Sequence, residues 1–307
     1  MEGKFNRRAM LAGSAAAAAA LALTGSCRTT DEVEKGPAAK TVEQPAPRVF
    51  QPGFKLGVCD WTIRKRANPE SLALAKKIGL DGVQVDFGGG QNELQLFDPA
   101  LQKRFLEEAE KQQMQIASLA MATLNNIPYK SDPRAERWVE QCIDVCRAMK
   151  VKVVLLAFFG NGDLRKDPKG IDVVVERLKK VAPKAEDAGV TFGIESYLSA
   201  EQHIEILDRV GSAAVKVYYD VANSNQAGYD IYSEIRLLGK RICEFHAKDY
   251  GNLYGMGTIA FPEVRRAMDD IGYRGWIVME GTKMPLGVED SCRYDAKYLR
   301  TVFPQMI

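Results

Sequence analysis

The segment Ile242-Cys-Glu-Phe-His-Ala-Lys-Asp249 is an apolar run that reaches a histidine and then becomes polar at once. The chain has two histidines in 307 residues, so the position of this one is informative. An apolar run of this kind is typical of a short buried strand, here with one metal-competent side chain at its C-terminal end. Three other runs share the pattern: Phe192-Gly-Ile-Glu195, Val215-Lys-Val-Tyr-Tyr-Asp220 and Trp276-Ile-Val-Met-Glu280. We expect these four strand ends to meet.

These runs belong to a series of eight predicted strands that alternate with helical patterns. The strands are Leu56–Trp61, Gly82–Phe87, Gln115–Met121, Val151–Phe159, Thr191–Ser196, Val215–Asp220, Ile242–Lys248 and Trp276–Thr282. Apolar runs with little polar alternation are typical of parallel strands buried on both faces. Eight strand–helix units predict a (β/α)8 TIM barrel over residues 53–307. A doubly wound open sheet is the alternative, but Gly88-Gly-Gly90 lacks the spacing of a dinucleotide-binding fingerprint.

Boundary signals support the helices between these strands. A capping side chain precedes proline at Asn68-Pro69, Asp98-Pro99 and Asp132-Pro133, as at many helix starts. Ser199-Ala-Glu-Gln202 predicts a capping box. Glycines are expected to end five of the helices, at Gly79, Gly189, Gly211, Gly239 and Gly272.

The first 27 residues predict an export signal rather than part of the fold. Lys4, Arg7 and Arg8 precede an apolar run, Met10 to Leu23, that is short for a membrane span. The arginine pair resembles a twin-arginine signal, with the general secretory route as the alternative. Leu23-Thr-Gly-Ser-Cys27 resembles a bacterial lipobox with Cys27 as the lipidated residue. The expected location is therefore the periplasm, either as a soluble protein or as a lipoprotein anchored to the membrane through Cys27.

Residues 28–52 are polar and interrupted by prolines, which predicts a disordered linker. The formal net charge is +2 and no basic block occurs in the predicted barrel. Because nucleic-acid binding normally requires a clustered basic face, we expect no nucleic-acid partner. An odd number of cysteines follows Cys27, so they cannot all pair within the chain. We interpret them as small core side chains: Cys59, Cys142, Cys146, Cys243 and Cys292.

Glu195, Asp220, His246 and Glu280 would form a mostly oxygen metal site at four neighbouring strand ends. Neighbouring strands lie about 4.8 Å apart, so these side chains can reach one ion. The ligand types favour Mn²⁺, with Mg²⁺, Co²⁺ or Zn²⁺ as alternatives. Two free positions would accept a sugar carbonyl and the adjacent hydroxyl, and the ion would acidify the neighbouring C–H. Glu195 and Glu280, on the outer strands of the four, are the expected proton-transferring pair.

In order and approximate spacing, this quartet resembles the metal ligands of the sugar phosphate isomerase/epimerase superfamily. These xylose isomerase-like TIM barrels include ketose 3-epimerases, hydroxypyruvate isomerase and inosose dehydratase. The resemblance covers roughly Phe54 to the C-terminus. It implies that Glu195 and Glu280 are acid–base catalysts working through an enediolate. It also implies that Glu201 contacts the sugar, although a first-turn acid is favoured by the helix dipole in any case.

Two positions depart from the epimerase pattern. A histidine expected three residues after the aspartate ligand is Asn223, and an arginine expected soon after His246 is replaced by Lys248-Asp249. We expect Asn223 and Lys248 to bind substrate. The alternative for Asn223 is a turn residue, and the alternative for Lys248 is a solvated ion pair with Asp249. His203, in a predicted helix, is interpreted as structural. Three residues near the first three strand ends either line the pocket or pack in loops: Trp61, Asp86 and Asn125.

The predicted function is a metal-dependent sugar isomerase or epimerase that transfers a proton next to a carbonyl. Phosphorylated sugars are cytoplasmic metabolites, so an exported member is expected to use a non-phosphorylated sugar. The same chemistry can expel a leaving group from the next carbon. A lyase or dehydratase acting on a keto sugar, such as a 3-keto-glycoside, is therefore one alternative. A non-catalytic sugar-binding lipoprotein is another, and the sequence leaves open whether two barrels form a homodimer.

Overall fold

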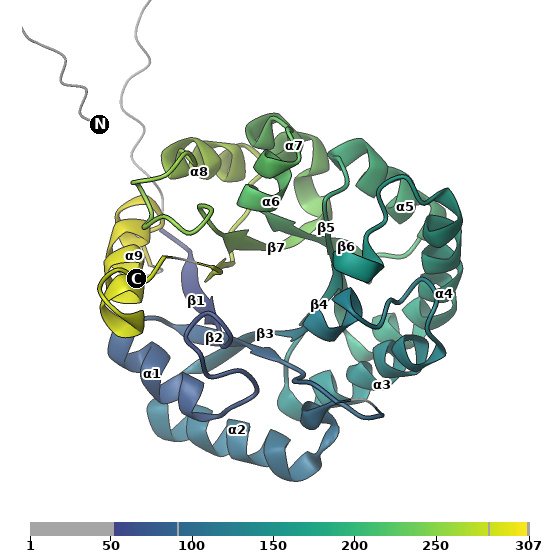
Figure 1. Ribbon diagram of the computed structural model, residues 1–307, viewed down its shortest axis with the longest axis horizontal. Coiled ribbons are helices and arrows are strands. Elements are labelled where there is room, and N and C mark those ends of the chain that lie inside the picture. Colours follow the sequence, from purple (N-terminus) through teal and green to yellow (C-terminus); the bar gives the residue numbers. More distant parts are fainter. Residues whose placement is uncertain (1–51, 91, 282, 306–307) are drawn as a thin grey trace, which may run out of the picture. The chain divides into compact units, whose positions relative to one another are not determined.

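The computed structural model describes residues 52–305 except residues 91 and 282. Eight parallel strands form a closed barrel in sequence order, surrounded by helices (Figure 1). The strands are β1 (Lys55–Cys59), β2 (Gly82–Asp86), β3 (Gln115–Met121), β4 (Val153–Phe158), β5 (Thr191–Ser196), β6 (Val215–Asp220), β7 (Ile242–Ala247) and β8 (Trp276–Met279). Because β1 pairs with both β2 and β8, the sheet has no edge. The TIM barrel is thus confirmed, and the open sheet was wrong.

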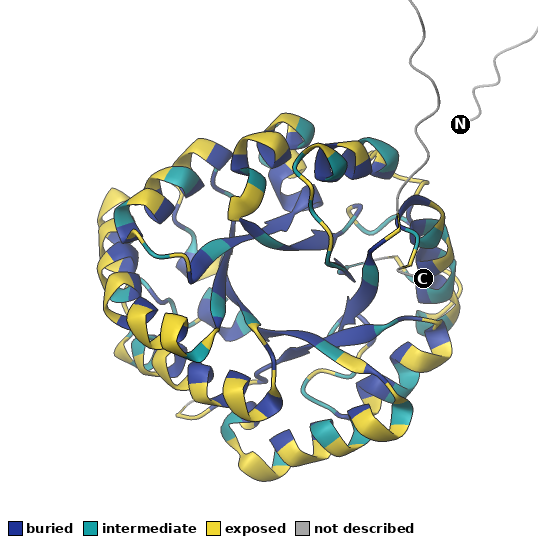
Figure 2. Cartoon of the chain, turned by 180° about the vertical axis from the view of Figure 1, so that it is seen from behind, coloured by how far each residue is buried: buried dark blue, intermediate teal, exposed yellow. Residues whose placement is uncertain are grey.

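The predicted export signal, the lipobox and nearly all of the predicted linker lie outside the described residues, so those assignments stay predictions. The helices around the barrel are α1 (Glu70–Ile78), α2 (Pro99–Gln112), α3 (Pro133–Met149), α4 (Pro168–Ala188), α5 (Ala200–Val210), α6 (Val221–Gln226), α7 (Ile231–Leu238), α8 (Phe261–Asp270) and α9 (Val288–Val302). Figure 2 shows their exposed faces directed outward and the strands buried behind them. Within the described ranges, no helix is long and apolar enough to cross a membrane.

The predicted helix starts agree with the structure at two of the three Asx-Pro pairs. The Asp98 and Asp132 side chains accept backbone N–H groups in the first turns of α2 and α3. Helix α1 begins one residue later than predicted, although Asn68 Oδ1 still accepts the N–H of Glu70 at 3.0 Å. Both halves of the capping box formed by Ser199 and Gln202 are present at the start of α5. Local side-chain chemistry therefore fixes most helix starts.

The predicted C-terminal glycines fall into two groups. Gly79, Gly189 and Gly211 adopt the left-handed conformation that ends α1, α4 and α5. Gly239 caps α7 with a different backbone geometry, φ 54° and ψ −126°. Gly272 also follows its helix as predicted: α8 ends at Asp270, Ile271 is the cap, and the N–H of Gly272 donates to the Asp269 carbonyl at 3.0 Å. Gly272 has a positive φ one residue further on.

Strand ends differ from the prediction mainly at β8. This strand stops at Met279, so Glu280 is the first residue beyond it. The backbone N–H of Glu280 still donates to the Ala247 carbonyl at 2.8 Å, which keeps Glu280 level with the end of β7. On the neighbouring pair of strands, Asp220 and His246 are direct register partners. The closed barrel thus brings the carboxyl ends of β5 to β8 to one rim.

Most apolar residues form one core that includes both strand and helix side chains. A smaller cluster of Ala120, Leu155, Ala157 and Tyr218 is separate from that core. Polar side chains are also buried among the strands, including Gln84, Ser118 and Glu244. Cysteines in the described part of the chain are free; four are buried and Cys243 is partly buried, as expected for core residues.

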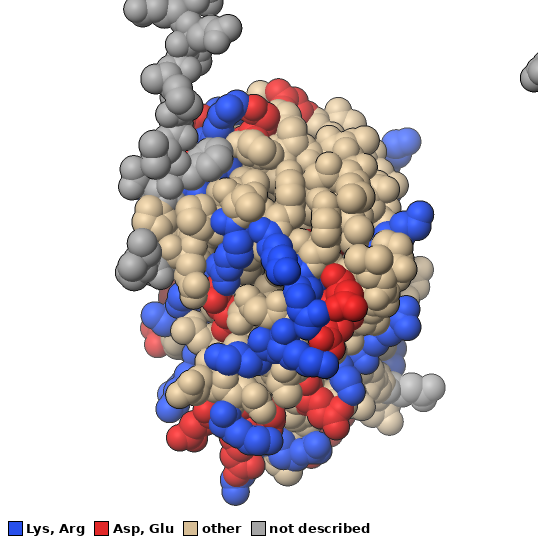
Figure 3. Space-filling view, turned by 90° about the vertical axis from the view of Figure 1, so that its left-hand side faces the viewer, with Lys and Arg blue, Asp and Glu red and all other residues tan. Residues whose placement is uncertain are grey.

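The outer surface formed by α1, α8 and α9 carries lysine and arginine next to aspartate and glutamate (Figure 3). Lys77 Nζ lies 2.7 Å from Glu289 Oε2, which joins α1 to α9. Arg293 contacts both Glu289 and Asp290 within α9. These basic groups therefore have acidic partners.

Candidate metal and sugar site

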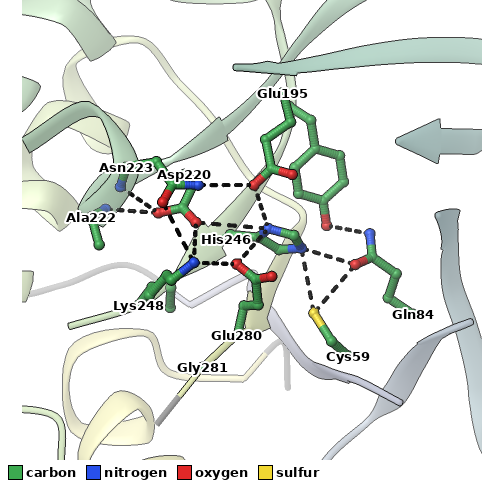
Figure 4. Close-up of polar contacts among 12 residues, drawn as sticks. Cys59, Gln84, Glu195, Asp220, Ala222, Asn223, His246, Lys248, Glu280 and Gly281 are labelled. Carbon is green, nitrogen blue, oxygen red and sulfur yellow. Dashed lines mark hydrogen bonds and ion pairs between the residues drawn. The ribbon is translucent and has the colours of Figure 1, made fainter. Parts of the chain in front are cut away.

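Glu195, Asp220, His246 and Glu280 converge at the C-terminal rim of the barrel (Figure 4). One ligand atom from each lies within 4.8 Å of the others. His246 Nδ1 is 2.9 Å from Glu195 Oε1, 3.5 Å from Glu280 Oε2 and 4.0 Å from Asp220 Oδ2. Around an octahedral ion with bonds of about 2.1 Å, adjacent ligand atoms are about 3 Å apart and opposite ones about 4.2 Å apart. The three distances from His246 Nδ1 lie close to this range.

The two carboxylate oxygens of Asp220 have different surroundings, because Asp220 ends β6 and also caps α6. Its Oδ1 accepts the backbone N–H groups of Ala222 at 2.8 Å and Asn223 at 2.9 Å. Its Oδ2 is buried and has no hydrogen-bond partner. A buried carboxylate oxygen without a partner is costly, so such atoms call for an explanation. A cation held by Oδ2 and the other three ligand atoms would supply one, and the residues therefore fit a divalent metal.

Lys248 follows β7 and reaches over the same cluster. Its ammonium group is 3.0 Å from Glu280 Oε2 and 3.6 Å from Asp220 Oδ2. Lys248 also donates to Asn223 Oδ1 at 3.4 Å, while Asn223 Nδ2 donates to Glu195 Oε1 at 3.5 Å. The structure thus places two of the three predicted substrate-binding residues, Asn223 and Lys248, beside the quartet. Their contact with a substrate remains a prediction.

Charge balance perturbs the titration of these groups. Burial raises the pKa of Asp220 to about 7; the cation of Lys248 opposes this shift, and the neighbouring glutamates reinforce it. Burial alone would raise the pKa of Glu280, but His246 and Lys248 outweigh burial and lower it to about 2. Burial would lower the pKa of His246, whereas the surrounding carboxylates raise it to about 9. Without a metal, the cluster is therefore a network of closely paired charges.

His246 also contacts polar side chains beneath the rim. Its Nε2 is 2.9 Å from Gln84 Oε1 and 3.4 Å from Cys59 Sγ. The Gln84 amide in turn donates to Ser118 Oγ at 2.9 Å and to Tyr218 OH at 3.0 Å. The sequence reasoning did not identify Gln84. The available signal was a polar residue in the middle of Gly82-Val-Gln-Val-Asp86, a strand that is otherwise apolar up to its final residue.

The cluster opens into a cavity of about 320 Å³. Its lining is Trp61, Arg66, Ala122, Asn125, Leu155, Ala157, Phe159, Glu195, Tyr197, Asn223, Lys248 and Glu280. The Trp61 indole N–H donates to Glu280 Oε1 at 3.2 Å, and Asn125 Oδ1 accepts the Phe159 N–H at 2.9 Å. Trp61 and Asn125 are thus pocket residues. Asp86 is not in the lining; it is buried and pairs with Arg66 at 2.9 Å. Sequence reasoning missed Arg66, Phe159 and Tyr197 as lining residues.

Three other residues named from the sequence lie outside this lining. Glu201 is exposed in the first turn of α5, and its sugar contact remains a prediction. His203 is buried, with Nε2 2.9 Å from Ser196 Oγ and Nδ1 3.0 Å from the Ser199 carbonyl, as expected for a structural histidine. Asp249 is buried and accepts the N–H groups of Thr258 and Ile259. The alternative of a solvated Lys248–Asp249 pair was therefore wrong.

The family described as xylose isomerase-like TIM barrel matches residues 72–302. D-psicose 3-epimerase of Enterocloster bolteae is 28% identical over 141 residues, which cover 43% of this chain and 46% of that protein. A 2-epi-5-epi-valiolone 7-phosphate 2-epimerase of Actinoplanes is 23% identical over 57% of this chain and 65% of its own length. The chain thus matches about half to two thirds of the length of these curated relatives.

Two solved structures show the same fold. D-psicose 3-epimerase with D-tagatose from Clostridium cellulolyticum has a TM-score of 0.69 at 18% identity, covering 81% of this chain and 99% of that one. A 3-keto-D-glucoside 4-epimerase from E. coli has a TM-score of 0.67 at 13% identity, with coverage of 81% and 99%. The family match spans most of the barrel and agrees with its closed topology. The chain therefore belongs to the xylose isomerase-like TIM barrel family.

Proposed function

We propose that the protein is a divalent-metal-dependent sugar epimerase or isomerase, with Mn²⁺ as the preferred metal. The carrying observation is the convergence of three carboxylates and one imidazole at the base of an open cavity, where the buried Asp220 Oδ2 accepts no hydrogen bond. Glu195, Asp220, His246 and Glu280 would hold the ion. The names of the related epimerases support a sugar substrate. A bound ion would polarise the sugar carbonyl and acidify the adjacent C–H.

Glu195 and Glu280 are the proposed proton-transferring pair. They come from β5 and the end of β8, with β6 and β7 between them, so they approach a bound sugar from two sides. Nearby positive charge lowers the pKa of Glu280, which keeps its carboxylate ionised at neutral pH, the form that a general base requires. The Trp61 N–H fixes its other oxygen at 3.2 Å. Glu195, acting as the carboxylic acid, would then donate its proton to the opposite face of the enediolate, which inverts that carbon and leaves Glu280 with the proton that it accepted.

A non-phosphorylated sugar fits the described cavity. Its two cationic lining residues are already paired, Arg66 with Asp86 and Lys248 with Glu280 and Asp220. A phosphate would have to compete with these buried carboxylates for the same cations. The export-like sequence of residues 1–27 supports the same substrate class and a periplasmic or lipid-anchored location.

Lys248 favours one second candidate. An ammonium group beside Glu280, where the epimerase pattern has a different residue, would stabilise an oxyanion that leaves from the carbon next to the enediolate. That chemistry would make the protein a lyase acting on a 3-keto-glycoside. The two candidates share the metal, the first proton transfer and the two glutamates, and they differ in the product.

One experiment tests both candidates. The Mn²⁺-loaded protein is incubated in D₂O with D-psicose, D-tagatose, D-fructose and 3-keto-glucosides, and mass spectrometry follows deuterium uptake and products. Glu195→Gln and Glu280→Gln should each reduce exchange by about 10²–10⁴-fold, whereas Glu289→Gln on the outer surface should not. Inverted or rearranged sugar indicates the epimerase or isomerase, and a freed aglycone indicates the lyase. Equal exchange by metal-free and metal-loaded protein would contradict both.

A further inference from the structure

The ring of His246 faces two different environments. Its Nδ1 faces the three carboxylates of the quartet, and its Nε2 faces Gln84 and Cys59 (Figure 4). A metal can bind Nδ1 only through the lone pair of that nitrogen, so the ring proton must then reside on Nε2. Because His246 is fully buried, that N–H needs an acceptor within the protein.

Gln84 supplies the acceptor. Its Oε1 lies 2.9 Å from His246 Nε2, whereas the Cys59 sulfur, a weak acceptor, is 3.4 Å away. The amide group is held from its other end, because Gln84 Nε2 donates to Ser118 Oγ and Tyr218 OH. Both hydroxyls also hydrogen-bond to the Glu244 carboxyl. When each hydroxyl donates a hydrogen bond to Glu244, its lone pairs remain to accept from the Gln84 NH₂ group, and the Gln84 carbonyl oxygen then faces His246.

We propose that Gln84 is a positioning residue that holds His246 as the Nε2–H tautomer and so directs the Nδ1 lone pair at the metal site. The inference rests on the proposed metal site and adds a residue from β2, on the opposite side of the barrel from the strands that carry the quartet. Gln84 touches neither the ion nor the sugar. It acts through the ring of His246, and the amide is neutral, so it adds no further charge to a cluster that already contains three carboxylates.

The test uses metal alone and the whole chain. Mn²⁺ affinity is measured by electron paramagnetic resonance for wild type, Gln84→Met, Gln84→Glu and Cys59→Ala. Methionine preserves the volume and removes the acceptor, and we expect a rise in Kd of about 10–100-fold. Glutamate restores an acceptor and should bind Mn²⁺ at least as tightly as wild type. Cys59→Ala removes the other neighbour of Nε2, and its Kd for Mn²⁺ should stay within about threefold of wild type, a much smaller change than the loss of the hydrogen-bond acceptor in Gln84→Met.

The second readout is which ring nitrogen of His246 carries the proton. The chain has two histidines, so ¹⁵N-histidine labelling gives two ring systems, and neutral His203 serves as the reference. In the Zn²⁺-loaded wild type, long-range ¹H–¹⁵N spectra should show the His246 proton on Nε2. A proton on Nδ1 would overturn the inference without any variant, even where Gln84→Met does not fold. Wild-type Mn²⁺ affinity in Gln84→Met would also overturn it. A wild type that binds no Mn²⁺ would instead overturn the metal site itself.

Discussion

Replacement of Asp220 by Asn should stabilise the metal-free protein while it abolishes metal binding. Asn keeps the side-chain oxygen that accepts the N–H groups of Ala222 and Asn223, and Asn and Asp are about equally good caps. The amide would place an NH₂ group where Oδ2 faces the cluster. That group cannot ligate a cation, so the substitution separates the metal-binding role of Asp220 from its role in capping α6.

The size of the stabilisation follows from the pKa of Asp220, which burial raises from 3.8 to about 7. A carboxyl whose folded pKa exceeds its unfolded value destabilises the fold once the pH rises above the unfolded value. Each pH unit is worth about 1.4 kcal/mol, so the penalty removed in Asp220→Asn is at most about 4 kcal/mol at pH 8. We expect a gain of about 2–4 kcal/mol in the free energy of unfolding at pH 8, and almost none at pH 4.

The assay is urea unfolding followed by circular dichroism, in EDTA and in saturating Mn²⁺. Wild type should gain about 2.7 kcal/mol when Mn²⁺ is at 100 times its Kd, whereas Asp220→Asn should gain nothing. Asp86→Asn is the matched control, because Asp86 is a buried carboxyl near this rim that pairs with Arg66 outside the quartet. It should retain the full Mn²⁺ effect. The reasoning is refuted if Asp220→Asn is less stable than wild type in EDTA at pH 8, or if Mn²⁺ stabilises both equally.

Three further predictions concern the charges and hydrogen bonds of the site. Mn²⁺ affinity should rise from pH 6 to pH 9. Asp220 and His246 have pKa values of about 7 and 9, and each must lose its proton before it binds the ion. Calorimetric titrations that give the same Kd across this pH range would contradict the prediction. Lys248→Met should tighten Mn²⁺ binding by about tenfold or more, because it removes a cation about 3–4 Å from two ligand oxygens. The same substitution should slow sugar turnover. Weaker Mn²⁺ binding by calorimetry would count against a metal site next to Lys248. Trp61→Phe should lower kcat by about 10- to 100-fold, as expected for one lost hydrogen bond to a charged group, because Glu280 loses its 3.2 Å indole partner. An unchanged kcat would show that this bond does not orient Glu280.

Much of the fold follows from local patterns in the sequence. The apolar runs located all eight strands, and Asp98, Asp132 and the Ser199–Gln202 box set helix starts through hydrogen bonds to nearby backbone. Errors occurred where local chemistry does not determine the end of an element. Strand β8 stops before Glu280, and α1 begins at Glu70 rather than at Pro69. These ends depend on how the element packs against its neighbours.

Some residues of the site could be predicted from the sequence, and others could not. Four strand-terminal ligands are recognisable because each follows an apolar run, and barrel closure then brings them to one rim. Gln84 could not be recognised so easily, because it contacts His246 from 162 positions away and only across the closed barrel. Arg66 likewise reaches the cavity from a loop, and its partner there, the buried Asp86, is 20 positions away in the sequence.

The central claim is that Glu195, Asp220, His246 and Glu280 bind one divalent cation. Anomalous X-ray diffraction from crystals grown with Mn²⁺, recorded on both sides of the manganese absorption edge, tests it most directly. The predicted result is a single anomalous peak about 2.0–2.3 Å from one oxygen of each carboxylate and from His246 Nδ1, with the Lys248 ammonium displaced from its position 3.0 Å from Glu280. A cluster that shows no peak, with Lys248 still paired to Glu280 and Asp220, would contradict the claim.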